Sequence, residues 1–332
     1  MRALALLKTG RIEGQQFKLV DIEEPKLRTD EVLVRINEVG LCRLDLELIE
    51  GNYMHLGYPS KLPLILGHEI LGKVEEVGDE VKYFRKYENV GIGPIYSACL
   101  RCENCLDGKE NLCEKLEITG ISCDGGLTQY IKINENFLFK VPEDLNKEAT
   151  TILCSGAIAY KCLKEILNNN SEKIGIFGND IIGIILSQML KYYGIETHIV
   201  LGRGEINDKV NYYDNALQAK DLKANFFDTT VILYHNPELI EKSISSLKKG
   251  GNAIVITLGI TKFPTIFECK NLLIPGLPTR LDINETIKFF KRKKIEIKKE
   301  EIEIKKMLEG LRKIKLRNTY KKLFLNVQKI LI

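Results

Sequence analysis

Four cysteines in residues 96–114 restrict what the chain can fold into more than any other feature of the sequence. Cys99, Cys102 and Cys105 are separated by two residues each, and Cys113 follows after seven more. Gaps of two residues let one turn of backbone present the thiolates to a common point, and the last cysteine can supply a fourth tetrahedral ligand. A zinc ion held by four protein sulfurs has no position left for water or substrate. We therefore expect a structural zinc site here.

Disulfides or ordinary buried thiols are the alternatives for these four cysteines. Disulfides need an oxidising compartment, which nothing else in the sequence indicates. The chain starts MRALALLKTGRIEG, an apolar run too short for a signal peptide, and no later run reaches the roughly 20 apolar residues of a membrane span. We therefore expect a cytoplasmic protein without a membrane partner.

The charge balance argues against a nucleic-acid partner. The 49 lysines and arginines exceed the 45 aspartates and glutamates by only four in 332 residues. Most of the basic excess follows Lys288 and alternates with glutamate, as on a solvated surface.

A change of pattern near residue 150 divides the chain, which is long for a single core. Before it, residues 31–37 and 70–77 have the alternating pattern of β-strands. Beyond it, buried-strand runs alternate with helix-like segments, beginning with strand 173–177, helix 181–193 and strand 196–201. This order is typical of an α/β domain with a doubly wound parallel sheet that binds a dinucleotide.

The tail alternates again, with helix 283–292, strand 295–304, helix 305–313 and strand 322–327. A chain that begins in β structure, inserts an α/β unit and ends on a strand can return to its first domain. The expected domains are therefore 1–150 with 281–332, and 151–280.

Three further residues form a second candidate metal site. Cys42 follows the strand-like run EVLVRINEVG, His68 lies between glycine and glutamate, and Cys154 lies where the β-rich part meets the α/β part. Two thiolates and one imidazole make a three-ligand zinc site with an open fourth position, as a catalytic zinc requires. Taken singly, a buried cysteine is usually only a small apolar side chain. Distance along the sequence does not join the three.

The strings GLCRLDL, LILGHEILGKVEEVG, the cysteine loop and LCSGAIAYKCL, in this order, resemble the medium-chain zinc-dependent alcohol dehydrogenases. The resemblance covers nearly the whole chain and is weakest after about Asn207. It implies a GroES-like β-barrel catalytic domain that includes the tail, a Rossmann nucleotide-binding domain between, and an active site in the cleft.

The resemblance also implies roles for single residues. Cys42, His68 and Cys154 match the ligands of the catalytic zinc, and Glu69 matches a carboxylate that approaches the metal during ligand exchange. Asp45 matches the acid that orients the ligating histidine, whose tautomer has to be fixed.

The proton path departs from the family pattern. Two residues after the first cysteine the family usually has serine or threonine, which passes the alcohol proton outward, whereas this chain has Leu44. Some members place a relay histidine where this chain has Glu47. We therefore expect Glu47 or water to carry the proton, or a reaction other than alcohol oxidation.

The glycine motif after strand 173–177 is incomplete. Gly178 and Gly183 are present, but Asp180 stands where the G-x-G-x-x-G fingerprint has its second glycine. Its side chain and negative charge are expected beside the cofactor pyrophosphate, so we predict weakened binding.

The second strand of the α/β part is followed by Gly202 and Arg203, where NAD-binding chains carry an acidic residue for the ribose hydroxyl. This pair leaves room and a guanidinium for a 2′-phosphate, and the segment resembles archaeal glucose dehydrogenases of the same family, which favour NADP. A solvent-facing loop cation is the alternative for Arg203. Arg43 matches a position where some members contact the pyrophosphate, although a surface arginine fits as well.

The sequence thus predicts an oxidoreductase that transfers hydride between NAD(P), with NADP preferred, and an alcohol, polyol or sugar and its carbonyl product. Two zinc ions per chain and a homodimer or homotetramer are expected. Leu44 leaves open a zinc-containing NADPH-dependent reductase of activated C=C bonds. Asp180 leaves open a non-catalytic descendant of the family that serves as a binding or regulatory subunit.

Overall fold

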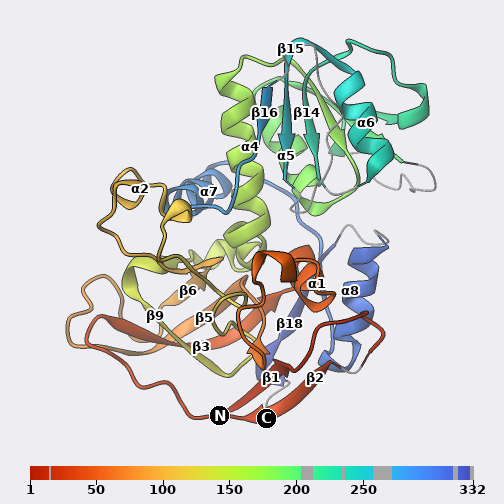
Figure 1. Cartoon of the computed structure of the whole chain (residues 1–332). Helices are drawn as coiled ribbons and strands as arrows, with labels where there is room; N and C mark the ends of the chain where they lie inside the picture. The colour runs from red at the N-terminus through yellow and green to blue at the C-terminus, as the bar shows by residue number, and fades with distance from the viewer. Residues whose placement is uncertain (15, 203–211, 234–235, 257–270, 317–320, 330–332) are drawn as a thin grey trace. The chain divides into compact units, whose positions relative to one another are not determined.

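The computed structural model describes residues 1–332 except 15, 203–211, 234–235, 257–270, 317–320 and 330–332 (Figure 1). The chain divides into two compact units. One comprises Met1–Ser155 together with Leu277–Ile332, and the other comprises Gly156–Gly276. The tail thus belongs to the unit in which the chain begins, and both Cys42 and Cys154 belong to that unit.

Antiparallel pairing predominates in the first unit. A seven-stranded sheet has the order β10-β6-β5-β3-β18-β17, with β9 also paired to β3. Its strands are β3 (Glu31–Gly40), β5 (Ile70–Val77), β6 (Asn89–Ile92), β9 (Tyr130–Asn134), β10 (Leu138–Lys140), β17 (Lys299–Glu301) and β18 (Lys322–Asn326). The other described strands form a three-stranded sheet and a pair, namely β2 (Phe17–Asp21), β1 (Arg2–Leu6) and β4 (Leu64–Ile65), and β7 (Ile95–Ser97) with β8 (Glu117–Ile118).

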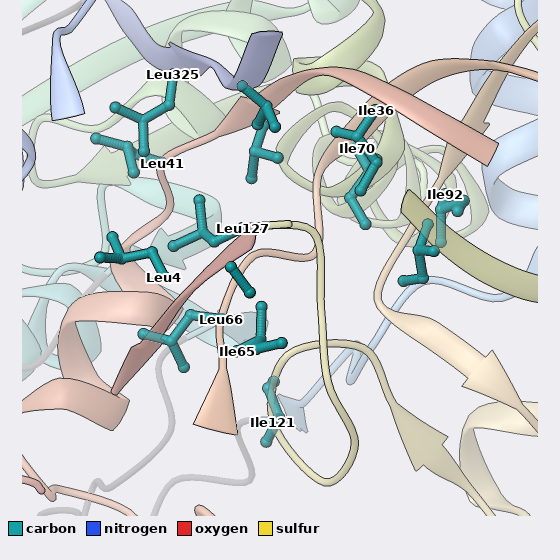
Figure 2. Packing of buried hydrophobic residues seen from close by; sticks show 14 of the residues in the cluster. Leu4, Ile36, Leu41, Ile65, Leu66, Ile70, Ile92, Ile121, Leu127 and Leu325 are labelled. Carbon is teal, nitrogen blue, oxygen red and sulfur yellow. The ribbon is translucent and has the colours of Figure 1, made fainter. Parts of the chain in front are cut away.

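The alternating pattern of β3 determines which of its side chains enter the core. Val32, Val34 and Ile36 are fully buried, whereas Leu33 and Arg35 between them are half-buried. Figure 2 shows side chains of β3, β5 and β18 in this core. Each such aliphatic side chain contributes about 1.5–3 kcal/mol on burial. The core therefore joins the tail strand β18 to strands from the start of the chain.

The tail elements differ in extent from those predicted. Helix α7 (Arg280–Arg292) begins before residue 283 because Thr279 caps it, exchanging hydrogen bonds with Asp282. The strand predicted over 295–304 was too long, since only Lys299–Glu301 is a strand. β17 is short because its hydrogen-bonding partner is short. It pairs in parallel with only the first three residues of β18. Helix α8 (Met307–Lys315) follows.

The second unit contains a six-stranded parallel sheet. Its order is β13-β12-β11-β14-β15-β16, which by chain position is 3-2-1-4-5-6, the dinucleotide-binding arrangement. Its elements are β11 (Lys173–Phe177), β12 (Glu196–Leu201), β13 (Asn215–Gln218), β14 (Phe227–Ile232), β15 (Leu247–Val255), β16 (Asn271–Leu273), α4 (Ala157–Asn168), α5 (Ile181–Lys191) and α6 (Pro237–Ser245). The predicted doubly wound parallel sheet is confirmed.

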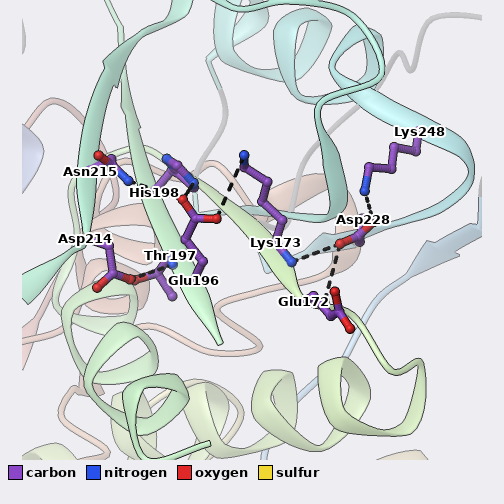
Figure 3. A network of polar contacts seen from close by, with 9 residues as sticks. All are labelled: Glu172, Lys173, Glu196, Thr197, His198, Asp214, Asn215, Asp228 and Lys248. Atoms are coloured by element: carbon purple, nitrogen blue, oxygen red, sulfur yellow. Dashed lines mark hydrogen bonds and ion pairs between the residues drawn. The ribbon is translucent and has the colours of Figure 1, made fainter. Parts of the chain in front are cut away.

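Polar side chains link the strands of this sheet at their amino ends (Figure 3). Asp228 accepts a hydrogen bond from the backbone N–H of Lys173 at 2.9 Å, and its other oxygen lies 2.6 Å from Lys248 Nζ. The buried His198 has its Nε2 2.8 Å from Glu196 Oε1. These contacts lie opposite the carboxyl ends of the strands, where such sheets bind ligands. We therefore assign them to the stability of the sheet.

Candidate metal centres and nucleotide-binding turn

Both predicted ligand sets come together in the first unit. Within each set the ligand atoms lie within 4.8 Å of one another. The sets are Cys99, Cys102, Cys105 and Cys113, and Cys42, His68, Glu69 and Cys154. None of the cysteines that the structure describes forms a disulfide. The geometry therefore favours metal ligation over the disulfide alternative.

Asp45 positions two of the predicted ligands with one side chain. Cys42 precedes helix α1 (Arg43–Ile49) as its N-cap residue, and its backbone N–H donates to Asp45 Oδ2 at 2.9 Å. The other oxygen, Oδ1, lies 3.3 Å from Nδ1 of the fully buried His68. Helix α1 begins three residues after the end of β3. The Asp45 carboxylate therefore holds Cys42, just after the end of β3, and His68, in the loop before β5, in fixed positions.

His68 is oriented as a metal ligand. Its Nδ1 lies 3.3 Å from Asp45 Oδ1, and its side chain belongs to the same ligand cluster as Cys42 and Cys154. Burial lowers the pKa of His68, but the charges of Asp45 and Cys42 and their hydrogen bonds to the ring more than offset this, and the pKa stands well above its ordinary value. A carboxylate behind a histidine is the usual support of a metal-bound imidazole.

Cys154 lies in a π-helical turn, Ile152–Gly156, between α3 (Ala149–Thr151) and α4. Such widened turns occur frequently at functional sites, since they shift the direction of one side chain. The pKa of Cys42 is held well below its usual value because Cys154 donates a hydrogen bond to it, and the same bond raises the pKa of Cys154 well above the ordinary value. The two sulfurs therefore lie close enough together for one cation to bind both.

Glu69 has two partners that sequence reasoning missed. Ser155 Oγ donates to Glu69 Oε1 at 3.1 Å, and the ammonium of Lys322 contacts Oε2. Burial lowers the pKa of Lys322, but the charge of Glu69 outweighs it and the pKa is raised. Adjacency to Cys154 was a signal for Ser155. Lys322 had none, since it comes from the tail strand β18.

The cluster fits a zinc ion. It combines two sulfurs, one imidazole nitrogen and one carboxylate oxygen, and soft thiolates with imidazole suit zinc. His68, Glu69 and Cys154 are almost fully buried, so little water competes for the position between them.

The four-cysteine lobe, residues 99–113, holds its thiolates with its own backbone. The N–H of Cys99 donates to Cys113 Sγ, and the N–H of Cys102 donates to Cys99 Sγ, both at 3.4 Å. Hydrogen bonds from the backbone of Arg101 and Cys102 lower the pKa of Cys99 to about 6. Cys102 is also the N-cap residue of the short helix α2 (Glu103–Leu106). The lobe thus presents an all-sulfur set in a loop.

Glu47 and Arg43 contact each other rather than the metal cluster. Glu47 Oε1 lies 3.6 Å from Arg43 Nη1, and Glu47 also accepts a hydrogen bond from the amide of Asn52. Arg43 donates to the backbone oxygen of Ile314 at 3.3 Å. Leu44 is half-buried against the core. The structure brings Asp45 and Glu69 to the cluster, and Glu47 is outside the set of ligand atoms.

The glycine turn directly follows β11, the strand that lies between β12 and β14 in the sheet. Gly178 has a φ of +103°, which favours glycine, and Gly183 lies where an added Cβ would come within 2.8 Å of Leu233. Asp180 is the N-cap residue of α5, and its Oδ1 accepts from Ile182 N–H at 3.1 Å. An aspartate directly before a helix is a capping signal that sequence reasoning had missed. Gly202 follows β12, and Arg203 lies outside the described residues.

Comparisons with known proteins give a consistent result. Residues 28–143 match the alcohol dehydrogenase GroES-like domain. An alcohol dehydrogenase of Geobacillus stearothermophilus is 32% identical over 305 residues, covering 85% of this chain and 89% of that protein. An NAD-dependent alcohol dehydrogenase of Sulfurisphaera tokodaii is 32% identical over 183 residues, 54% of this chain and 51% of that protein.

The fold comparison agrees with the sequence comparison. The solved structure of a cinnamyl alcohol dehydrogenase from Sorghum bicolor matches with a TM-score of 0.87 at 19% identity, over 99% of this chain and 98% of that chain. The predicted combination of a GroES-like domain with a Rossmann domain is confirmed. The chain therefore belongs to the medium-chain alcohol dehydrogenase family and is an NAD(P)-dependent, alcohol dehydrogenase-like oxidoreductase.

Proposed function

We propose that this protein is a zinc-dependent oxidoreductase that transfers a hydride between NAD(P) and an alcohol, polyol or sugar and its carbonyl product. The buried cluster of Cys42, His68, Glu69 and Cys154 carries this proposal. Three of its members suit a permanent zinc ligand, whereas Glu69 has two other partners and can yield its position to a substrate oxygen.

The chain's own residues prepare this chemistry. Asp45 keeps the imidazole proton on Nδ1 of His68, so that Nε2 keeps its lone pair for a metal. Bound zinc polarises the oxygen of the substrate and lowers the pKa of an alcohol. Leu44 cannot accept the released proton, so we assign its transfer to Glu47 on the next turn of α1, together with water.

The four-cysteine lobe is assigned a second, structural zinc, because its four sulfurs leave no position for a substrate.

We also propose that the protein is a homodimer or homotetramer in the cytoplasm. Strand β16 is the last strand of the described parallel sheet. Leu272 in this strand is 44% exposed and Ile274 just after it is 63% exposed, and a second subunit can cover this apolar surface. No helix among the described residues is long and apolar enough to cross a bilayer. Light scattering of the purified protein measures the subunit number, and a monomer would refute the assembly.

The decisive experiment combines metal analysis with two substrate panels. Purified protein should contain two zinc ions per chain and should oxidise NADPH with aldehydes or ketones. Leu44 favours a second candidate, a reductase of activated C=C bonds, because hydride addition to carbon needs no relay from an alcohol. In that case only enones would consume NADPH. A single zinc with no turnover in either panel would refute both candidates.

We propose NADP as the preferred cofactor on the sequence pair Gly202 and Arg203. Arg203→Ala should weaken NADP binding about ten- to a hundredfold, or roughly 1.5–3 kcal/mol, and leave NAD binding nearly unchanged, as measured by fluorescence titration. Asp180→Gly is the matched comparison. It should tighten both cofactors together at a cost of a few tenths of a kcal/mol in capping. Equal losses for both cofactors in Arg203→Ala would remove the NADP assignment.

A further inference from the structure

A lysine from the tail is buried against a carboxylate of the metal cluster. The side chains of Lys322 and Glu69 are 2% and 0% exposed, and their charged groups are in contact. Lys322 Nζ also lies 3.5 Å from Ser155 Oγ, the group that donates to the other oxygen of Glu69. Both carboxylate oxygens therefore have a partner other than a metal.

The space for this contact is provided by Gly40 at the end of β3. A Cβ at this position would lie 2.3 Å from Glu69 Oε2 and 3.0 Å from Lys322 Cε. Any other residue would separate the carboxylate from the ammonium. The arrangement thus involves β3, the residue before β5, and β18, three strands adjacent in the sheet.

Lys322 adds a positive charge to a cluster of acidic and thiolate ligands. The two thiolates, Glu69 and the buried Asp45 carry four negative charges, and a zinc ion would compensate two of them. Buried charges persist only when paired, and breaking such a pair costs several kcal/mol. Lys322 supplies a third positive charge, next to Glu69. It thereby makes the carboxylate a weaker donor toward a metal.

We propose that Lys322 is a positioning residue that competes with the metal for the Glu69 carboxylate and so keeps the fourth coordination position exchangeable. With Lys322 in place, Glu69 has a stable partner when a substrate oxygen takes its position. Without it, the carboxylate keeps only the Ser155 hydroxyl, and the metal becomes the nearest cation. The inference rests on the zinc of the proposed function.

The test measures zinc release from purified holoprotein to a chelator, together with kcat. Wild type should release zinc in two phases, and the phase missing in Cys42→Ala belongs to the cluster. Lys322→Met should slow this phase and lower kcat by about tenfold each, the scale of changes around ligands. The phase of the four-cysteine lobe is the internal reference and should not change. Lys322→Arg keeps the cation and should retain the wild-type release rate.

Glu69→Gln supplies the specific rescue. In the double variant Lys322→Met/Glu69→Gln the amide binds zinc weakly, so release should be fast again and kcat should exceed that of Lys322→Met. Lys299→Met is the matched control, because Lys299 lies opposite Lys322 in the neighbouring strand and pairs at 2.6 Å with Glu38, which is in neither ligand set. It should leave the release rate unchanged.

Three outcomes would overturn the inference. Release from Lys322→Met that is as fast as in wild type, or a kcat that the double variant does not improve, would make Lys322 a purely structural residue. A wild type with a single release phase would refute the catalytic zinc of the proposed function as well. If Lys322→Met does not fold, Ser155→Ala removes the other partner of Glu69 and should slow release about two- to fivefold. An unchanged rate there would contradict the competition.

Discussion

The four-cysteine lobe and the cluster around Cys42 each offer four metal ligands, but they are assembled in opposite ways. The lobe takes all its ligands from residues 99–113 and holds them with backbone N–H groups of residues 99–115. The cluster takes its ligands from the start of α1, from the loop before β5 and from a π-helical turn, and its counter-charge from β18. A local loop can thus make a closed site, whereas a site with an exchangeable ligand needs support from several elements.

The lobe is also attached to the tail. The carboxylate of Glu110, which is 1% exposed, accepts hydrogen bonds from the backbone N–H and Nε of Arg280, at 2.6 and 3.2 Å. Arg280 is the first residue of α7, where a negative charge is favourable because the helix dipole is positive there. Loss of the lobe should therefore loosen the tail, and with it the fold rather than the chemistry.

The largest effect is expected at the cluster. Cys42→Ala should lower kcat by about a thousandfold, or about 4 kcal/mol, because a Lewis acid contributes several kcal/mol to such a step. The fold should remain, since Asp45 accepts from the backbone N–H of residue 42, which alanine keeps. Steady-state kinetics and metal analysis are the measurements, with one zinc per chain expected. Retained turnover would show that the cluster is not the active site.

A smaller effect is expected in the lobe, on the free energy of unfolding and not on the rate of turnover. Cys102→Ala should lower the free energy of unfolding of the first unit by about 3 kcal/mol through loss of a metal site, and kcat per folded molecule should change by less than about twofold. Thermal unfolding followed by zinc analysis tests this. Cys123→Ala is the control, because Cys123 is in neither ligand set. A loss of kcat without loss of stability would contradict the assigned structural role.

The smallest effect is expected at Asp45. Asp45→Asn leaves one oxygen for two partners, the Cys42 N–H and His68 Nδ1, so zinc affinity or kcat should fall about 10–100-fold. Competition with a chelator measures the affinity. Glu47→Gln changes a carboxylate of the same helix that lies outside the cluster, and it should retain zinc. Equal zinc loss in both variants would place the cause in α1 rather than in the orientation of His68.

Strand positions in regular segments followed from local pattern. β5, β11 and β12 have the bounds predicted from the sequence, because partial alternation in β5 and a continuous apolar run in β11 and β12 are properties of each segment alone. β17 does not, because its length depends on the hydrogen bonds that β18 offers. The role of Asp180 as the N-cap residue of α5 was also not predicted. The comparison with the glycine motif drew attention only to its negative charge.

The four-cysteine lobe follows from local spacing, since Cys99 to Cys113 place all four thiolates within reach through one short segment. The sequence also supplied the ligands Cys42, His68 and Cys154 by resemblance. The groups that surround these ligands depend on how distant segments pack together. Lys322 and Glu69 are far apart in the chain, and their contact exists because β18 pairs with β3, where Gly40 leaves room. No local sequence pattern predicts this contact. It forms only when β18 and the residue before β5 come together in the folded chain, where each buried charge needs an opposite charge beside it.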